Sequence, residues 1–245
     1  MLNLTKVIIP LIAISELELY WKNPETGVIL KENHPSQLVR LTKYWKSIES
    51  SNEEIKKYRR FNPKKRAIAS AQNQSAWSAA FICYVYRTAG INLVDGFEYS
   101  RRHLTYIAKA IDLYRKKSQQ TDNLSDSFMF YDKSEFSNNT TISLFDSISV
   151  SDLICLNRKR KNGIFTNHNM NSLSRFKNLE KVKDVSHCDI VVKKYQDSGK
   201  NFLVAIGGNV SHTVAKKIFE VKDDKVFLIT NGKRRASHYF GFVQI

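Results

Sequence analysis

Three polar residues of this sequence have the types and surroundings that nucleophilic acyl transfer requires. Ser78 lies near the start of an apolar stretch, S-A-W-S-A-A-F-I-C-Y-V-Y-R-T-A-G, which spans residues 75–90. His187 directly precedes the strand-like segment C-D-I-V-V, and Asn209 follows A-I-G-G. In this chemistry an imidazole takes the proton of the nucleophile, and an amide orients the imidazole ring. We therefore predict that Ser78, His187 and Asn209 are catalytic; a serine that bonds a backbone amide and a structural histidine are the alternatives.

The stretch 75–90 predicts the buried helix that would carry Ser78. We expect Ser75 to cap its amino end through the side-chain oxygen. Gly90 is expected to end the helix, because only glycine enters the left-handed conformation at little cost. The stretch is apolar nearly all round, which is typical of a helix inside a domain. Ser78 then falls in the first turn, where the helix macrodipole favours developing negative charge.

Three further residues are candidates for substrate binding, and each has a structural alternative. Trp77 adjoins Ser78 and either forms a wall for a glycan or peptide or belongs to the core. His103 lies in the block S-R-R-H-L-T-Y-I and either lines the cleft or caps and packs a helix. Arg158 follows a predicted strand and either holds a substrate carboxylate or is an exposed charge.

The strand that begins near His187 carries a second candidate for orienting the imidazole ring. Asp189 lies two residues after His187, and alternate residues of a strand share one face, so Asp189 rivals Asn209 in this role. Cys188 is expected on the opposite face. The two glycines that precede Asn209 allow another segment to approach the backbone closely.

The order of the predicted elements indicates an α+β domain, with helices first and antiparallel strands afterwards. We predict a single domain over residues 1–245, in which the polar residues 118–143 form a long connection that could cover the site. The Asp223-Asp224 pair is predicted as a hairpin turn. Helices are predicted in 7–20, with Pro10 in the opening turn, 35–48 and 103–117, and strands in 152–157, 189–195, 202–206, 214–221, 226–230 and 239–243.

The charge balance favours polyanionic partners. The chain has 39 Lys and Arg against 23 Asp and Glu, a net charge of +16. Nucleic acid, anionic lipid and the bacterial cell wall all attract such a surface. No nucleic-acid-binding motif accompanies the basic clusters, so we do not expect a sequence-specific reader of nucleic acid. The three cysteines show no disulfide framework or zinc spacing, Cys83 and Cys155 are expected as core hydrophobes, and no metal or cofactor is predicted.

Several blocks of the sequence resemble papain-like cell-wall hydrolases of the NlpC and CHAP type. The stretch F-I-C-Y-V-Y-R-T-A-G-I is similar to the helix that carries their nucleophile. A more specific resemblance, over roughly residues 11–221, is to one uncharacterised bacterial branch of that superfamily. It rests on W-S-A-A-F-I, S-R-R-H-L-T-Y-I, S-D-L-I-C-L-N-R, H-C-D-I-V-V and I-G-G-N-V. The resemblance implies a papain-like fold, with its helical half packed on the antiparallel sheet.

The resemblance places Ser78 where the superfamily has its catalytic cysteine, His187 on the catalytic histidine and Asn209 on the orienting residue. The serine is a departure with chemical consequences. A cysteine in such a site can rest as a thiolate, whereas a serine must lose its proton during the attack. A second departure is Ser151, which stands where the family usually has glycine. The site is thus either a working Ser-His-Asn hydrolase or a retained site that has lost its chemistry.

We therefore expect a peptidoglycan amidase or endopeptidase. The residues 7–14 are too short to cross a membrane and do not form a clear signal peptide. The protein is therefore expected to be made in the bacterial cytoplasm and to act in the periplasm or on a target cell wall after another route of export. An antibacterial effector of a type VI-like secretion machine, with an immunity protein, fits this expectation. The alternatives are an inactive module that binds wall fragments or a protein, and a nucleic-acid binder or nuclease.

Overall fold

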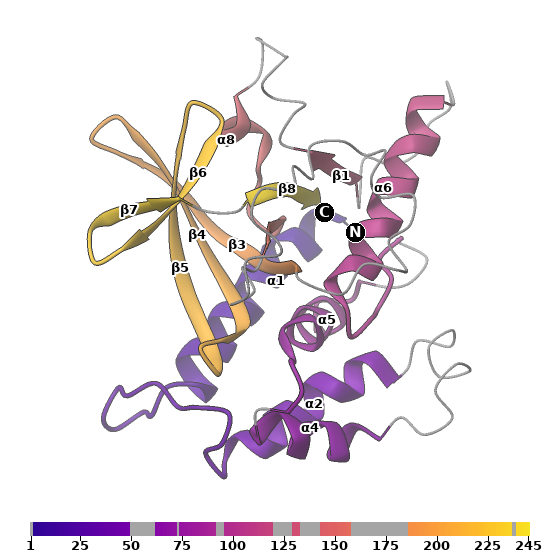
Figure 1. Cartoon of the computed structure of the whole chain (residues 1–245), viewed down its shortest axis with the longest axis vertical. Coiled ribbons are helices and arrows are strands. Elements are labelled where there is room, and N and C mark those ends of the chain that lie inside the picture. Colours follow the sequence, from indigo (N-terminus) through magenta and orange to yellow (C-terminus); the bar gives the residue numbers. More distant parts are fainter. Residues whose placement is uncertain are drawn as a thin grey trace, which may run out of the picture.

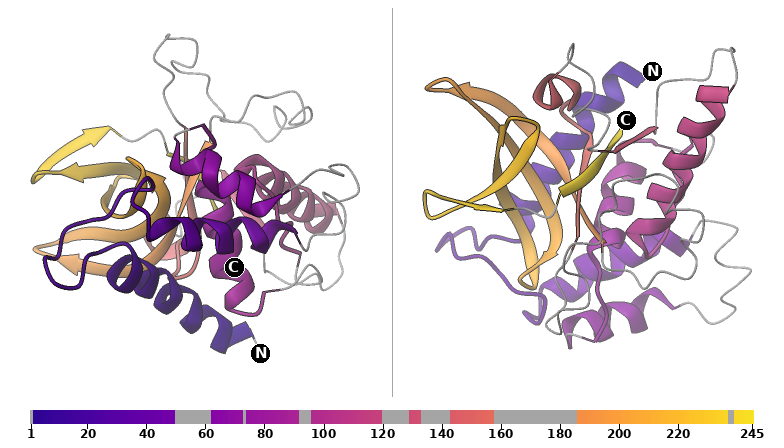
Figure 2. Two further views of the ribbon diagram at one scale, coloured as in Figure 1. Left: turned by 90° about the horizontal axis from the view of Figure 1, so that it is seen from below. Right: turned by 45° about the horizontal axis from the view of Figure 1, so that its top comes forward.

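The computed structural model describes residues 2–49, 62–72, 74–91, 96–119, 129–132, 143–157, 186–236 and 239–245. Its helices are α1 (Leu2–Ser15), the π-helix η1 (Glu16–Tyr20), α2 (Gln37–Glu49), α4 (Pro63–Ala71), α5 (Ser78–Thr88), α6 (His103–Gln119) and α8 (Leu144–Ser147). Its strands are β1 (Met129–Asp132), β2 (Leu153–Asn157), β3 (Ser186–Asp197), β4 (Lys200–Val210), β5 (Thr213–Lys222), β6 (Lys225–Thr230), β7 (Lys233–Ala236) and β8 (Tyr239–Gln244). Strands β3 to β7 lie on one side of the molecule and helices α2, α4, α5 and α6 on the other (Figures 1 and 2).

The strands form one antiparallel sheet in the order β1-β8-β2-β3-β4-β5-β6-β7. The predicted α+β class, with helices in the first half and an antiparallel sheet in the second, is confirmed. Each of the six predicted strand segments lies wholly or largely within a strand, whereas β1 and β7 were not predicted. Asp223 and Asp224 join β5 to β6 with φ angles of +50° and +53°. These are the left-handed conformations of a tight hairpin turn, so that prediction is also confirmed.

Helix α5 is the predicted central helix, and eight of its 11 residues are buried. Its amino end differs from the prediction, because the helix begins at Ser78 and Trp77 occupies the N-cap position without a side-chain cap bond. Ser75 therefore precedes the helix and does not cap it. Gly90 follows the helix with a φ of +87°, which confirms its predicted role as the stop. Ser78 is thus the first residue of a helix that lies inside the core.

Gly208 allows strand β4 to pack directly against α5. A Cβ atom at this position would lie 2.5 Å from Cβ of Phe81 and 2.8 Å from Cζ3 of Trp77, which is closer than real Cβ contacts. The close backbone approach predicted for the two glycines before Asn209 is therefore confirmed. This contact sets the distance between the helix that carries Ser78 and the sheet.

The structure corrects the expectation for two of the cysteines. Cys155 and Cys188 form a disulfide between β2 and β3, with their Cα atoms 4.2 Å apart. They are direct partners in the pairing of these two strands. The sequence spacing of 33 residues gives no sign of this register, which is why the pair was not predicted. Cys83 is buried in α5, as expected.

The first helix is longer at its amino end than predicted. Because α1 begins at Leu2, Pro10 lies well inside the helix and not in its opening turn. Across the described residues, no helix has both the length and the apolar character needed to cross a membrane. Of the predicted polar connection 118–143, only the last two residues of α6, strand β1 and Ser143 are among the described residues.

Candidate active site

The candidate site lies where the first residues of two helices meet the middle of the sheet. Ser78 is the first residue of α5, and His103 is the first residue of α6. His187 and Asp189 are on the same face of β3, and Lys217 is on β5, two strands away. Ser78, His103, His187 and Asp189 are buried, so their polar atoms must find partners inside the protein.

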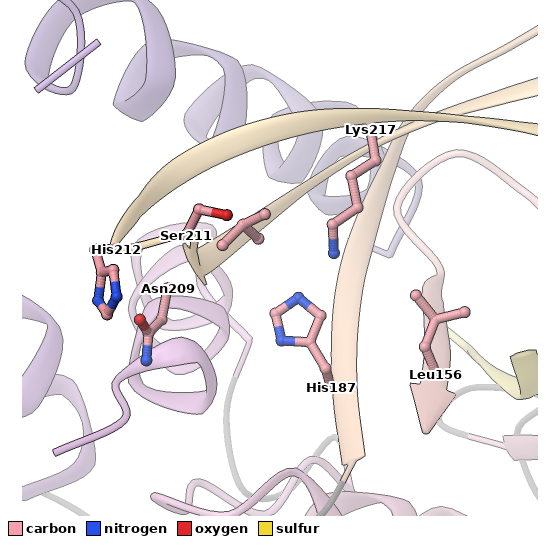
Figure 3. A pocket seen from close by; sticks show the side chains of 7 residues that line it. Leu156, His187, Asn209, Ser211, His212 and Lys217 are labelled. Atoms are coloured by element: carbon pink, nitrogen blue, oxygen red, sulfur yellow. The ribbon is translucent and has the colours of Figure 1, made fainter. Parts of the chain in front are cut away.

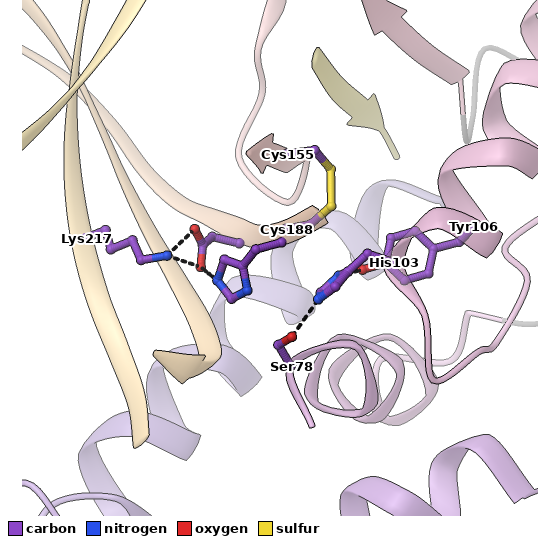
Figure 4. A network of polar contacts seen from close by, with 8 residues as sticks. Ser78, His103, Tyr106, Cys155, Cys188 and Lys217 are labelled. Carbon is purple, nitrogen blue, oxygen red and sulfur yellow. Dashed lines mark hydrogen bonds and ion pairs between the residues drawn. A yellow bond between two sulfur atoms is a disulfide. The ribbon is translucent and has the colours of Figure 1, made fainter. Parts of the chain in front are cut away.

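Ser78 is hydrogen-bonded to His103. The Oγ atom lies 2.6 Å from Nε2 of His103, and the other ring nitrogen, Nδ1, contacts the hydroxyl of Tyr106 (Figure 4). Tyr106 is one turn along α6, and residues three apart on a helix lie on neighbouring positions of one face. The helix therefore presents an imidazole to Ser78 with a hydroxyl behind it.

His187 is held by a carboxylate, which is bound in turn by an ammonium group. Its Nε2 lies 2.8 Å from Oδ1 of Asp189, and Nζ of Lys217 lies 2.7 Å from Oδ2 and 3.0 Å from Oδ1 of the same carboxylate. Burial raises the pKa of Asp189, but the charges of His187 and Lys217 outweigh this effect and bring the pKa well below its ordinary value. Asp189 is therefore a carboxylate near neutral pH.

The backbone of β4 makes room for this pair. A Cβ atom at Gly207 would lie 1.8 Å from Oδ1 of Asp189 and 3.0 Å from Nε2 of His187. No side chain larger than hydrogen fits there while the pair stays in place. Gly207 thus makes room for the His187–Asp189 pair, and Gly208 makes room for α5.

The two histidine clusters are adjacent. The ring centroids of His103 and His187 are 5.5 Å apart, with an angle of 66° between the ring planes. The ring of His103 therefore contacts both Ser78 and His187, and it joins the two residues into one cluster. The hydrogen bond of 2.6 Å with the serine oxygen is nevertheless made by His103, which was predicted to line the cleft or bind substrate, or else to cap and pack a helix.

A pocket of about 450 Å³ opens beside His187 (Figure 3). Asn209 lies at its edge with a φ of +56°. Because Asp189 contacts Nε2 of His187 directly, the structure favours Asp189 over Asn209 as the group that orients this ring. The pocket is lined by Leu156, His187, Asn209, Val210, Ser211, His212 and Lys217.

The structure places the remaining predicted residues as follows. Trp77 is fully buried, its indole N–H donates to Glu32, and its ring stacks on Trp21 with centroids 4.9 Å apart. It is therefore a core residue and not a wall for substrate, because no part of its ring reaches solvent. Glu32 also contacts His212, whose Nδ1 lies 2.9 Å from Oε1. Arg158 lies outside the described residues.

Comparison with known proteins places these elements in one family. Residues 32–243 match a family described as "Uncharacterized protein conserved in bacteria (DUF2272)". The chain belongs to this family. The DUF2272 span contains every residue of the two histidine clusters and begins at Glu32, which accepts the hydrogen bond from Trp77. Searches of curated proteins and of solved structures each return no match.

The protonation pattern of the two histidines in this DUF2272 protein differs. A carboxylate can only accept hydrogen bonds, so Nε2 of His187 carries a proton. The partners of His103 are two hydroxyls, which can each donate or accept. His103 can therefore adopt either tautomer, including the one that accepts the proton of Ser78. Among the described residues, no group of three or more His, Cys, Asp or Glu side chains is placed to hold a metal ion.

Sequence reasoning missed Tyr106 and Lys217. The spacing of three residues between His103 and Tyr106 was a usable signal, because it places both side chains on one helix face. Lys217 gave no such signal: it follows Lys216 in the strand V-A-K-K-I-F, and only the pairing of β3, β4 and β5 shows which lysine faces Asp189.

Proposed function

We propose that this protein is a serine-dependent hydrolase that cleaves an amide bond of peptidoglycan. The observation that carries the proposal is the 2.6 Å contact between Ser78 Oγ and His103 Nε2 at the amino end of α5, beside the His187–Asp189 pair. A hydroxyl becomes a nucleophile when a neighbouring base takes its proton, and the imidazole of His103 is in hydrogen-bond contact with this hydroxyl.

The position of Ser78 supports the same chemistry. The first amides of a helix have no partner within the helix, and the macrodipole adds a partial positive charge there. An oxyanion that forms next to Ser78 would therefore be stabilised by the amino end of α5. Proton transfer by a positioned imidazole contributes about 100- to 10,000-fold to such reactions.

The choice of peptidoglycan rests on the sequence resemblance and on charge. Papain-like hydrolases of the NlpC and CHAP type act on the cell wall, and the papain-like fold is part of this proposal. The net charge of +16 favours an anionic polymer as substrate. The site supports acyl transfer, and both amidases and endopeptidases use this chemistry.

The disulfide supports action outside the cytoplasm. Disulfides persist in oxidising compartments, among them the bacterial periplasm, and are rare in the cytosol. The bond between Cys155 and Cys188 therefore agrees with the proposal that the protein acts in the periplasm or on a target cell wall. An antibacterial effector with a cognate immunity protein remains our proposal for its biological role.

The test is a digest of purified peptidoglycan, with the products identified by mass spectrometry. Wild type is compared with Ser78→Ala, Ser78→Cys and His187→Ala. We expect new fragments from wild type and none from either alanine variant. Fragments that persist with Ser78→Ala would contradict the assignment of the nucleophile.

A module that binds wall fragments without cutting them is the second candidate. The observation that favours it is the exposure of Ser78, which is only 4%. This candidate predicts no fragments from wild type, cleavage gained by Ser78→Cys, and wall binding that does not change with Ser78→Ala.

A further inference from the structure

One face of strands β3 to β7 carries a basic surface. Alternate residues along a strand point to opposite faces of the sheet. One set of these residues, which includes Leu203, Phe219 and Val226, is buried in an apolar cluster together with residues of α8. We call the other set the basic face, because it contains six exposed basic residues. These are Lys193, Lys200, Lys216, Lys222, Lys225 and Arg234.

Positive charge exceeds negative charge on this face. Among the described residues of β3 to β7, the acidic residues that share the face are Asp197 and Glu220. Glu220 is already paired, because the guanidinium group of Arg234 contacts both oxygens of its carboxylate. Asp197 is the cross-strand partner of Lys200. The lysines at the other positions of the face therefore supply the excess of positive charge.

Two of these lysines repel each other across a strand pair. Lys222 and Lys225 are direct partners on β5 and β6. Like charges directly opposite each other destabilise a sheet. The turn between them contains Asp223 and Asp224, and Oδ1 of Asp224 accepts a hydrogen bond from the amide of Leu144 at 3.0 Å. An anion bound at this end of the face would relieve the repulsion.

Two further lysines of the face lie opposite apolar residues. The cross-strand partner of Lys193 is Val204, and that of Lys216 is Ile206. Both lysines are exposed, whereas both partners are buried. The cations of the face are thus distributed from β3 to β7. Five neighbouring strands cover about 19 Å across a sheet, so the face suits an extended polymer better than a single small anion.

The aromatic residues of the face indicate how a polymer would be recognised. Tyr195 stacks on Phe202 with ring centroids 5.2 Å apart, and Nζ of Lys193 lies 5.1 Å from the centroid of Tyr195. The guanidinium carbon of Arg234 lies 5.7 Å from the centroid of Phe227. A nucleic-acid base that stacks on these rings must compete with these contacts, whereas an anionic group needs only the cations. The face therefore favours recognition by charge over recognition by base stacking.

We propose that the basic face binds the carboxylate groups of peptidoglycan and anchors the protein on the polymer. The choice of polymer rests on the proposed function. Free carboxylates of the stem peptides make peptidoglycan anionic, and a surface of exposed cations attracts such a polymer. Nucleic acid is the competing polyanion, and it forms one arm of the experiment.

The basic face is separate from the candidate active site. Lys216 and Lys217 are adjacent on β5, so their side chains point to opposite faces of the sheet. Lys217 contacts Asp189 in the candidate site, whereas Lys216 belongs to the basic face. Polymer bound at the basic face therefore holds the protein on the wall and does not orient the bond that is cut.

The experiment measures binding of the full chain to insoluble peptidoglycan by sedimentation. All proteins carry Ser78→Ala, so that cutting does not interfere with binding. The face variant is Lys193→Gln/Lys216→Gln/Lys222→Gln. The matched control is Lys43→Gln/Lys46→Gln/Lys64→Gln, which changes three exposed lysines of α2 and α4 and removes the same net charge. Peptidoglycan whose carboxylates have been converted to amides is the second probe.

We expect the face variant to bind peptidoglycan at least about tenfold more weakly than the parent, and the control to stay within about twofold. The amidated polymer should bind the parent at least about tenfold more weakly than the unmodified polymer, and added salt should weaken the binding that remains. Thermal unfolding should be the same for all three proteins, because the substituted lysines are exposed. Equal weakening by the face variant and the control would overturn the inference.

A single-stranded oligothymidylate tests the competing polyanion. We expect it to displace the protein from peptidoglycan poorly when the two polymers are supplied at equal concentrations of negative charge. Efficient displacement, together with loss of oligonucleotide binding in the face variant, would assign the face to nucleic acid and contradict the proposal.

Digestion by proteins that retain Ser78 separates this inference from the proposed function. The face variant should release fragments from insoluble peptidoglycan about tenfold more slowly than wild type, and should cut a soluble stem peptide at the wild-type rate. Fragments from wild type, with unchanged binding by the face variant, would remove the inference and leave the hydrolase. Loss of binding by the face variant alone, without fragments from wild type, would leave the anchoring surface and remove the hydrolase.

Discussion

The carboxylate of Asp189 fills the space that a side chain at Gly207 would need. A Cβ atom on Gly207 would lie 1.8 Å from Oδ1 of Asp189. Gly207→Ala should therefore displace the carboxylate and release His187. We expect a loss of about 2 kcal/mol in the free energy of unfolding, which is typical of an overpacked core, together with strongly reduced hydrolysis. Denaturant unfolding measures the first quantity and fragment release the second.

A double-mutant cycle shows whether this effect passes through Asp189. In an Asp189→Asn background, Gly207→Ala should reduce hydrolysis less than it does in wild type, because the contact it disturbs is already weakened. Fully additive effects on the rate would contradict the proposed link.

Lys217 and Lys216 are neighbours with different expected effects. Lys217 binds the buried carboxylate of Asp189, whereas Lys216 is exposed. Lys217→Met should cost about 3 kcal/mol of unfolding free energy, because it leaves a buried charge with one partner fewer. Lys216→Met is the matched control, with an expected change within about 0.5 kcal/mol. Equal stabilities of the two variants in urea unfolding would show that the ion pair contributes nothing.

The disulfide between β2 and β3 should stabilise the fold. The two cysteines are 33 residues apart, and closing a loop of this size is worth about 3–4 kcal/mol in the chain-entropy treatment. Dithiothreitol should therefore lower the Tm of wild type. The double variant Cys155→Ala/Cys188→Ala should have a Tm close to that of reduced wild type, and the reductant should not change it. A response of the double variant would mean that the reductant acts elsewhere.

The stability of the protein should depend on pH through Asp152. Burial raises the pKa of Asp152 to about 7, although the amides of Ser149 and Ile245 donate to it and oppose this shift. A carboxyl whose pKa is higher in the folded protein than in the unfolded chain binds more protons when folded. Its contribution is therefore fully present below about pH 4 and is lost as the pH rises to about 7, by about 4 kcal/mol.

Asp152→Asn isolates this contribution, because its side chain does not titrate. The difference in unfolding free energy between wild type and Asp152→Asn should change steadily between about pH 4 and pH 7, with wild type losing relative stability as the pH rises. A difference that stays constant across this range would contradict the raised pKa.

The sequence predicted those parts of the fold that depend on local patterns. The helix α5, its stop at Gly90 and the turn at Asp223 and Asp224 follow from the preferences of a few adjacent residues. The close approach at Gly208 also followed from residue type alone. The start of α5 was placed two residues too early, because Ser75 satisfied the rule for a cap that the chain does not use.

The parts that were missed depend on contacts between distant segments. Ser78 meets His103 across 25 positions in the sequence, and no spacing rule connects the first residues of two separate helices. Lys217 on β5 contacts Asp189 on β3 across the intervening strand β4, and this arrangement depends on the order of the strands in the sheet. The cysteine pair required the register of β2 against β3, and alternation along a single strand says nothing about which residue of the neighbouring strand lies opposite.

The same cysteine pair has a consequence for the fidelity of assembly. Along β3, His187, Cys188 and Asp189 alternate between the two faces, so a slip of one residue against β2 would exchange the histidine pair with the cysteine. Only the register that sets Cys155 opposite Cys188 allows the two sulfurs to join. Oxidation therefore selects, from the possible pairings of these strands, the one in which His187 faces its partners, and the bond holds that register until a reductant breaks it.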